Sequence, residues 1–364
     1  MALAYTKRPP ARGMVYESFQ SGRAVKPKRN IFIKILSYFI PFKGDSVFEG
    51  VRKVIFTGAL ACFIYFGSTV GADFYSEFKA GQLQDYLGGL VGGDYNPEVR
   101  EKLEQMRPDA KPLPDYLAVY EKNNDFVGWI RIGDTAVNYP VLQADNNIYY
   151  LNNDFERNYS KGGSIFADSR NRFDGLDISD NTVLYGHNIM TGNYFNAASN
   201  YYKGAEKGDM SFYKNNPIIN FDTLYEKSEW KVFATVLFNT QEQWGEVYRY
   251  NTMHDFATAD DFNNFIINIM DRSVIHTDVD LQYGDKILTL STCYWPMGDK
   301  VDTRCVVFAR KVREGESSYV NVDAAVNNYK YELRFTEQAR RYGTLRTERN
   351  WDTSKLIGYK EEEQ

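Results

Sequence analysis

The chain has 364 residues, of which 43% are hydrophobic and 25% are charged, and these proportions indicate a globular protein rather than a disordered or fibrous one. The net charge of −5 combines a charge of +8 on residues 1–53 with a charge of −13 on residues 54–364. Because the main body is acidic, we do not expect a nucleic acid as a partner. Three cysteines are too few for the disulfide framework of a small secreted domain.

The first element along the chain is an uncharged run of 19 residues, Val54–Ala72. A helix rises about 1.5 Å per residue, so this run spans roughly a bilayer core. Arg52 and Lys53 precede it and acidic residues follow, which predicts a single-pass protein of the cell membrane, with residues 1–53 in the cytoplasm, the main body outside and membrane lipid as a partner. A cleaved signal peptide is the alternative, but the run starts too deep in the chain and lacks a clear cleavage site.

Upstream of this run, residues 30–42 form a shorter apolar segment that lysines and arginines surround or interrupt. The segment is too short to cross a membrane, and we predict a helix that lies in the interface of the inner leaflet. A disordered basic tail that contains some apolar residues is the alternative.

Residues 73–116 are helical or linker in character. The helix of the apolar run is predicted to continue to the glycines between Gly88 and Gly93, and Asn96–Met106 to form a short charged helix before a proline-rich linker. We place the main domain at residues 117–313. Residues 314–364 are a charged C-terminal extension, which we expect to be a solvated tail with some helix.

The main domain is dominated by short alternating segments between turns, which predicts a mainly β fold. Because few helices separate them, the segments favour a closed or nearly closed barrel over a parallel α/β sheet. One helix interrupts the pattern at residues 258–272, where apolar side chains recur at helical spacing and Thr258 can cap the first turn. The predicted strands are residues 128–134, 136–143, 162–168, 181–188, 229–238, 286–293 and 304–312.

The candidate nucleophile is Cys293, at the end of the strand that begins at Lys286. Side chains alternate between the two faces of a strand, so Leu288 and Leu290 share one face, and Cys293 shares the other with Ser291. If the leucines face the core, Cys293 projects from the opposite face at a strand end, where the loop leaves room for a substrate.

Two further residues fit the same site. Tyr185 and His187 share a face near the end of an earlier strand. Arg304 and Cys305 are consecutive, so they point to opposite faces, and Cys305 is expected to point away from the site if Arg304 points into it. We expect His254 and His276 to be surface residues.

A cysteine, a histidine and an arginine together suit thiol acyl transfer. The cysteine attacks a carbonyl to give a thioester, which a second nucleophile resolves, while the histidine moves the proton. The arginine stays protonated and can only position groups or stabilise an oxyanion. Alternatives are a buried structural cysteine, a disulfide between Cys293 and Cys305, and a zinc site formed by these two thiols with His187.

The motif "TLSTC", eleven residues before Arg304, together with the upstream "VLYGHN", resembles the signature of the sortases, the membrane-anchored cysteine transpeptidases of Gram-positive bacteria. The order of the three residues is His187, Cys293, Arg304. The resemblance covers residues 117–313, and the segments "YPVLQADNNIYYLNNDF" and "GGSIFADSRN" resemble the class B subfamily.

This resemblance implies a closed barrel of about eight strands, with N-terminal helices, a helix before the strand of Cys293, and a single N-terminal transmembrane helix. It implies cleavage of the C-terminal sorting signal of a secreted protein after Thr, a thioester on Cys293, and transfer to an amine of a peptidoglycan precursor. His187 would be the acid and base, and Arg304 would bind the oxyanion or substrate carbonyls. No metal or organic cofactor is implied. The residues implied to bind the substrate peptide are Asn147, Leu151, Tyr185, Tyr248 and Ser291.

The chain departs from the class B pattern at the residues directly after the cysteine. Class B relatives can carry acidic residues there, whereas this chain has Tyr294 and Trp295. This difference puts in doubt an acidic residue as a third member of the site. We hypothesise that these aromatic side chains cover the bound peptide and exclude water, favouring transfer over hydrolysis.

Other functions stay open at this point. A pilin-polymerising enzyme would use the same residues with a lysine as the acceptor, and a cysteine hydrolase would differ only in using water. An anchored binding module without activity is a further alternative, although His187, Cys293 and Arg304 are all present.

Overall fold

The computed structural model describes residues 31–189, 193–244, 247–296, 298, 301–328 and 351–359. The chain divides into two compact units, residues 1–72 and 73–364. The predictions for residues 1–30, most of the basic cytoplasmic segment, lie outside the described residues.

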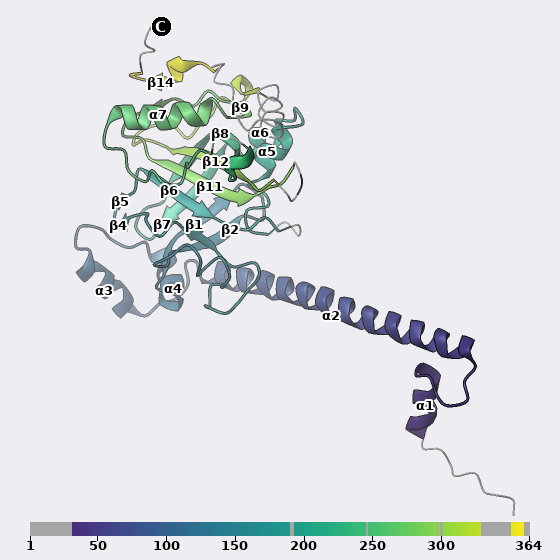
Figure 1. Ribbon diagram of the computed structural model, residues 1–364. Coiled ribbons are helices and arrows are strands. Elements are labelled where there is room, and N and C mark those ends of the chain that lie inside the picture. Colours follow the sequence, from purple (N-terminus) through teal and green to yellow (C-terminus); the bar gives the residue numbers. More distant parts are fainter. Residues whose placement is uncertain are drawn as a thin grey trace, which may run out of the picture. The chain divides into compact units, whose positions relative to one another are not determined.

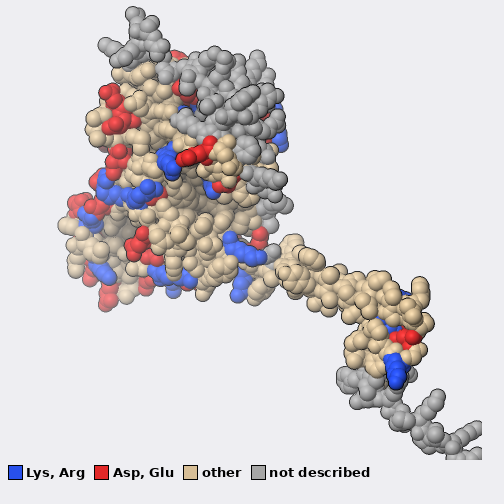
Figure 2. Space-filling view, in the orientation of Figure 1, with Lys and Arg blue, Asp and Glu red and all other residues tan. Residues whose placement is uncertain are grey.

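The first unit contains helix α1 (Ile31–Phe39) and the first part of helix α2 (Val47–Leu90). Lys53 donates a hydrogen bond to Asp45 at 2.8 Å, and the rings of Phe39 and Phe56 lie 5.7 Å apart, so α1 packs beside the start of α2. Helix α2 is long and apolar enough to cross a membrane by its length and composition. Figure 2 shows no charged side chain along its middle part, where the run 54–72 lies. A helix at residues 31–39 agrees with the predicted interfacial segment, whose position in a membrane stays a prediction.

The second unit begins with the rest of α2, which ends at Leu90, close to the predicted glycines. Helix α3 (Pro97–Met106) follows, capped as expected by Asn96, whose side chain accepts a hydrogen bond from the amide of Glu98. The predicted proline-rich linker contains the start of another helix, α4 (Pro114–Lys122). Its Tyr116, Leu117 and Val119 are buried in one cluster with Trp129 of the barrel.

Eight strands form a closed barrel in the second unit, which confirms the predicted fold class (Figure 1). Neighbouring strands are antiparallel except for the pairs β2–β3 and β6–β11, which are parallel. The order around the barrel is β1 (Phe126–Ile132), β2 (Asn138–Leu142), β3 (Ile165–Ala167), β6 (Asn181–Tyr185), β11 (Ile287–Cys293), β12 (Thr303–Lys311), β8 (Glu229–Asn239) and β7 (Ile218–Thr223).

Every predicted strand overlaps a strand of the barrel, and β7 is the one that the sequence did not indicate. The remaining elements are short. They are β4 (Phe173–Asp174), β5 (Asp177–Ile178), α5 (Asn200–Ala205), α6 (Ser211–Asn215), the 3-10 helix Glu242–Trp244, β9 (Ile275–His276), β10 (Leu281–Gln282), the 3-10 helix Val322–Ala324, β13 (Val326–Asn327), the 3-10 helix Thr353–Lys355 and β14 (Leu356–Ile357).

The barrel is packed on both sides of the sheet at β11 and β12. Leu288, Leu290 and Val307 belong to the inner cluster, as the alternation predicted. On the outer side, helix α7 (Ala259–Met270) covers the sheet (Figure 1) and packs its apolar stripe against Val306 and Phe308. Thr258 and Asp261 form a capping box at the start of α7. The helix was predicted at this position, immediately before the strand of Cys293.

The C-terminal extension is not the solvated tail that was expected, in so far as it is described. Trp351 and Leu356 are buried against α7, and β14 pairs with β10. The indole of Trp351 donates a hydrogen bond of 2.6 Å to Asp271 at the end of α7. The prediction failed because these apolar residues are isolated in a polar sequence and gain their partners only through tertiary contacts.

We therefore expect Trp351→Ala to lower the free energy of unfolding by about 3 kcal/mol, because it removes a large buried side chain and its hydrogen bond. Urea unfolding of the full chain followed by circular dichroism measures this change. Tyr319→Ala is the matched control, since Tyr319 is 74% exposed. Equal stability of the two variants would contradict the observed packing of the extension.

Candidate active site

The ladder between β11 and β12 sets the positions of the cysteine and the arginine. Cys293 is the last residue of β11, and its partner in the antiparallel register is Arg304. Side chains directly opposite each other in such a pair have Cβ atoms about 5 Å apart. Cys305, the next residue, is buried in the inner cluster of the barrel, so Arg304 and Cys305 point to opposite faces as predicted.

His187 follows the end of β6, which pairs in parallel with β11. Two bonds hold this segment beside the cysteine: Thr292 donates to the carbonyl of Gly186 at 2.7 Å, and Asn188 donates to the carbonyl of Cys293 at 2.6 Å. Gly186 is required by a close approach, since a Cβ there would lie 2.8 Å from the ring of Phe195. The imidazole Nε2 lies 2.9 Å from the carbonyl oxygen of Leu151, which can only accept, so Nε2 carries a proton and Nδ1 is the nitrogen available as a base.

A cavity of about 310 Å³ is bordered by all three residues, His187, Cys293 and Arg304. It is also bordered by four of the five predicted substrate-binding residues, which are Asn147, Leu151, Tyr185 and Ser291. Tyr248 is not among the lining residues. Its ring stacks on Phe238 at 5.8 Å and lies under the guanidinium of Arg272.

The two cysteines of the second unit are free thiols in different surroundings. Burial raises the pKa of the Cys293 thiol, Arg304 opposes that rise, and Asp302 adds to it, so the net pKa is above the usual value. Burial raises the pKa of Cys305 to about 12, which makes this thiol a poor nucleophile.

Arg304 is held by an acidic residue that the sequence reasoning missed. Its Nη1 donates to Asp302 Oδ1 at 2.5 Å and to the carbonyl of Thr303 at 3.0 Å. Asp302 also accepts bonds from the indole of Trp295 and the hydroxyl of Thr240. The acidic residue beside Arg304 therefore comes from the position just before β12 and not from the positions directly after the cysteine. Its place two residues before Arg304 was a signal that could have been used.

The aromatic residues after Cys293 differ in their surroundings. Tyr294 packs against the inner cluster of the barrel, its hydroxyl donates to Glu206 at 2.6 Å, and Lys203 lies over its ring. Trp295 is 50% exposed. Neither residue lines the cavity at Cys293. Because Tyr294 is packed against the barrel and Trp295 is half exposed, Trp295 is the better candidate to cover a bound peptide.

A buried carboxylate supports one wall of the cavity. Asp168 is fully buried and accepts hydrogen bonds from Tyr185 at 2.8 Å, from Asn147 at 3.0 Å and from Arg170 at 2.8 Å. Asn251, which also lines the cavity, donates to the Tyr185 hydroxyl at 2.9 Å. The network fixes Asn147 and Tyr185 in place, and nothing in the local sequence patterns around Asp168 indicated it.

The expectation that His254 and His276 are surface residues is wrong. The side chain of His254 is only 10% exposed and lies 3.8 Å from Asp168. Burial lowers the pKa of His276 to about 4. Within the described part of the chain, no three residues of the metal-binding types gather in one place, so the zinc alternative finds no support in the geometry.

Comparison with known proteins identifies the family. A family model of the sortase domain matches residues 130–312, half of the chain. The chain belongs to the sortase family. Sortases are cysteine transpeptidases, so the resemblance and the predicted type of enzyme are confirmed. The barrel strands from β2 to β12 and the cavity at Cys293 lie within the matched region.

Individual relatives are class B sortases. Sortase B of Staphylococcus aureus is 37% identical over 180 residues, which cover 50% of this chain and 68% of that protein. Sortase B of Listeria monocytogenes is 28% identical over 239 residues, 64% of this chain and 86% of that one. A solved complex of S. aureus sortase B with a substrate is 33% identical and superposes with a TM-score of 0.48, over 59% of this chain and 92% of that one. Sortase B from Bacillus anthracis, in complex with a compound named AAEK1, gives a TM-score of 0.46 and 28% identity, over 60% and 96% of the two chains.

The charges around Cys293 predict opposite pH shifts in two variants. Because Arg304 lowers the pKa of the thiol and Asp302 raises it, Arg304→Ala should move the pH midpoint of Cys293 alkylation upward and Asp302→Asn should move it downward. Iodoacetamide labelling of the full chain between pH 6 and 10, followed by intact mass, measures both midpoints, and a Cys62→Ala and Cys305→Ala background removes the signals of the other two thiols. Shifts in the same direction for both variants would contradict this electrostatic balance.

Proposed function

We propose that this sortase cleaves the C-terminal sorting signal of secreted proteins after Thr and joins the new carboxyl end to an amine of a peptidoglycan precursor. The observation that carries the proposal is the convergence of His187, Cys293 and Arg304 on one cavity. The acyl group is held as a thioester on Cys293 between the two steps.

The proton follows a short path in this scheme. The Cys293 thiol loses its proton to Nδ1 of His187, the sulfur attacks the Thr carbonyl, and the imidazolium returns the proton to the leaving amine as the C–N bond breaks. The bond from Nε2 to the carbonyl of Leu151 holds the ring in the required tautomer. The acceptor amine then attacks the thioester and gives a proton to Nδ1 of His187, and the C–S bond breaks as the sulfur takes up that proton and becomes a thiol again.

Arg304 stabilises the oxyanion of both tetrahedral intermediates. Its Nε and Nη2 groups have no hydrogen-bond partner among the described residues, so they can donate to a substrate oxygen. Asp302 is a positioning residue, because it fixes the guanidinium through Nη1. Since Arg304 is partly buried, its charge acts in a lower dielectric than it would in water.

The peptide lies along the wall formed by Asn147, Leu151, Tyr185 and Ser291. The bonds of Asn147 and Tyr185 to Asp168 give this wall a fixed shape, which limits the loss of side-chain entropy when a peptide binds. The hydroxyl of Ser291 is bonded to Tyr250 at 2.7 Å, which links the wall to the segment before α7. A contact of Tyr248 with the substrate stays a prediction.

Helix α2 is the membrane anchor in this proposal. Its run of residues 54–72 crosses the bilayer, the basic residues before it stay in the cytoplasm, and the barrel lies outside the cell. This orientation places the site on the side of the membrane where secreted proteins emerge and the cell wall is built.

The test is to incubate the full chain, in detergent, with peptides that carry Pro-x-Thr and related sorting sequences and with an amine acceptor. We expect a mass adduct on Cys293 that resolves to an amide, no adduct in Cys293→Ala, and nearly full activity in Cys305→Ala because that thiol is buried with a raised pKa. Glycine and lysine acceptors compared in parallel distinguish a cell-wall acceptor from a pilin-type acceptor. An adduct that yields only the acid would favour a hydrolase. Equal loss of activity in Cys293→Ala and Cys305→Ala would contradict the assignment of Cys293 as the nucleophile.

Trp295 tests the proposed exclusion of water. If its ring covers the bound peptide, Trp295→Ala should raise the share of hydrolysis over transfer, because water reaches the thioester more easily. Trp295→Phe keeps a ring but loses the bond to Asp302, so it separates covering from the positioning of Arg304. The ratio of hydrolysis product to transfer product is measured by mass spectrometry. An unchanged ratio in Trp295→Ala would rule out the covering role.

A further inference from the structure

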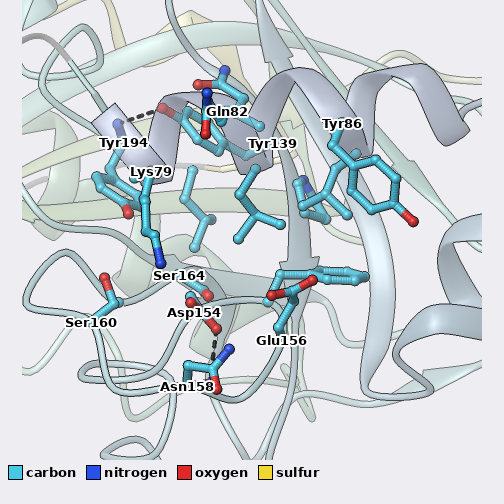
Figure 3. A pocket seen from close by; sticks show the side chains of 18 of the residues that line it. Lys79, Gln82, Tyr86, Tyr139, Asp154, Glu156, Asn158, Ser160, Ser164 and Tyr194 are labelled. Atoms are coloured by element: carbon cyan, nitrogen blue, oxygen red, sulfur yellow. Dashed lines mark hydrogen bonds between the residues drawn. The ribbon is translucent and has the colours of Figure 1, made fainter. Parts of the chain in front are cut away.

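A second cavity, of about 580 Å³, lies between α2 and the barrel (Figure 3). It shares no lining residue with the cavity at Cys293. One of its walls is a single face of α2, where Ser76, Ala80, Leu83 and Leu87 recur at helical spacing. Its size falls in the range of small-molecule sites, about 300–1,000 Å³. The proposed transpeptidation does not use this cavity.

The cavity combines an apolar floor with a polar rim. The apolar lining includes Leu83 and Leu87 of α2 and Pro140 and Ile165 of the barrel. At the rim, Figure 3 shows Lys79 and Gln82 on α2, and below them the loop that carries Asp154, Glu156 and Asn158. A ligand that fits both parts has an apolar portion and a head group that forms hydrogen bonds.

The position along the chain places this cavity close to the membrane. Ser76 follows the last residue of the apolar run, Ala72, by four residues. Four residues span at most about 14 Å, so the nearest lining residue lies within that distance of the end of the run in any arrangement of the two units. The cavity is therefore within reach of lipid head groups when α2 crosses the bilayer.

The charges at the rim select among head groups. One cation, Lys79, faces the two carboxylates of Asp154 and Glu156. A third carboxylate, Glu77, lies nearby with Oε2 buried and without a hydrogen-bond partner in the described chain. The excess of negative charge opposes a phosphate, whereas carboxylates and carboxamides bond readily to hydroxyl groups, and the rings of Tyr139 and Tyr194 offer flat apolar surfaces.

We propose that this cavity binds a membrane amphiphile whose head group is a neutral sugar. The rim would bond to the sugar hydroxyls, and the floor would hold the first carbons of the attached chain.

The walls of this cavity also hold His187. Tyr194 has the left-handed φ of 55°, its amide donates to the hydroxyl of Tyr139 at 3.2 Å, and the two rings stack at 5.3 Å. The next residue, Phe195, donates its amide to the carbonyl of His187 at 2.9 Å. On the other side, the loop that carries Asp154 and Glu156 begins near Leu151, whose carbonyl binds the His187 ring. A bound amphiphile would hold both contacts of His187 in place.

The experiment uses the full chain in phosphatidylcholine nanodiscs that also contain either diglucosyl diacylglycerol or phosphatidylglycerol. Lipid that stays with the protein after transfer into a sugar-free detergent is counted by mass spectrometry. We expect the glycolipid to be retained over phosphatidylglycerol by about tenfold, and Ala80→Trp to abolish this retention because the indole fills the cavity. Phe78→Trp, on the exposed side of α2, is the matched control and should retain the glycolipid.

A charge reversal makes the test sharper. Glu156→Lys should weaken retention of the glycolipid and raise that of phosphatidylglycerol, since it replaces a carboxylate by an ammonium group and removes the excess of negative charge at the rim. Retention of both lipids to the same extent by the wild type, or unchanged retention by a folded Ala80→Trp variant, would overturn the proposal. Equal displacement of the lipid by maltose and by dodecyl maltoside would overturn the membrane source of the ligand.

The link to His187 rests on the proposed function, whereas lipid retention is measured without any reaction. Ala80→Trp should lower the kcat of peptide cleavage by several-fold and leave the KM of the peptide nearly unchanged. Loss of retention without a change in kcat would overturn the link to His187. If the wild type cleaves no peptide but retains the glycolipid, the proposed function fails and the binding site stands.

Discussion

The antiparallel pairing of β11 with β12 is the constraint on which the site depends. In this register Cys293 faces Arg304, and both side chains project to the side of the sheet that borders the cavity. A shift by one residue would turn Arg304 into the inner cluster and bring Cys305 to the cavity in its place. The leucines of β11, packed inside the barrel, make such a shift costly, so core packing fixes the chemistry.

The surroundings of Cys293 balance opposing effects. Burial protects the sulfur from water but raises the pKa of its thiol, and Arg304 offsets part of that rise. Arg304 itself needs a partner in this half-buried position, and Asp302 supplies one. Because Asp302 takes only one of the two terminal nitrogens of Arg304, it orients the guanidinium and leaves the remaining donors for a substrate.

Much of the fold and the central residues of the site were predictable, because they rest on local patterns. Period-two alternation located the strands, and the capping box located α7. Strand β7 was missed although Asn220 and Asp222 alternate with the buried Ile219 and Phe221, a pattern that could have located it. The burial of Trp351 and His254 was beyond prediction for another reason: the residues that they contact, Asp271 and Asp168, lie far away in the sequence, and the alternation of a segment does not identify such partners. The same holds for the bonds that Asn147 and Tyr185 donate to Asp168.

The site residues show the same division. His187, Cys293 and Arg304 come from a motif with fixed spacing, and the cavity contains all three. Tyr248 was chosen from its segment alone. The structure brings its near neighbours Tyr250 and Asn251 toward the cavity, where Tyr250 contacts Ser291 and Asn251 contacts Tyr185. The sequence can indicate which loop borders a site, but it does not indicate which residue of that loop contacts the site. The path of the backbone decides which side chain faces the cavity.

The parallel pairing of β6 with β11 has a consequence for how the enzyme becomes active. Residues 186–286 lie between the two strands, so His187 and Cys293 meet only after a long loop has closed. Contacts of such large sequence separation form slowly, and the nucleophile has no base beside it until the barrel is complete. A chain that has not finished folding thus carries an ordinary thiol, and its reactivity appears together with the closed barrel.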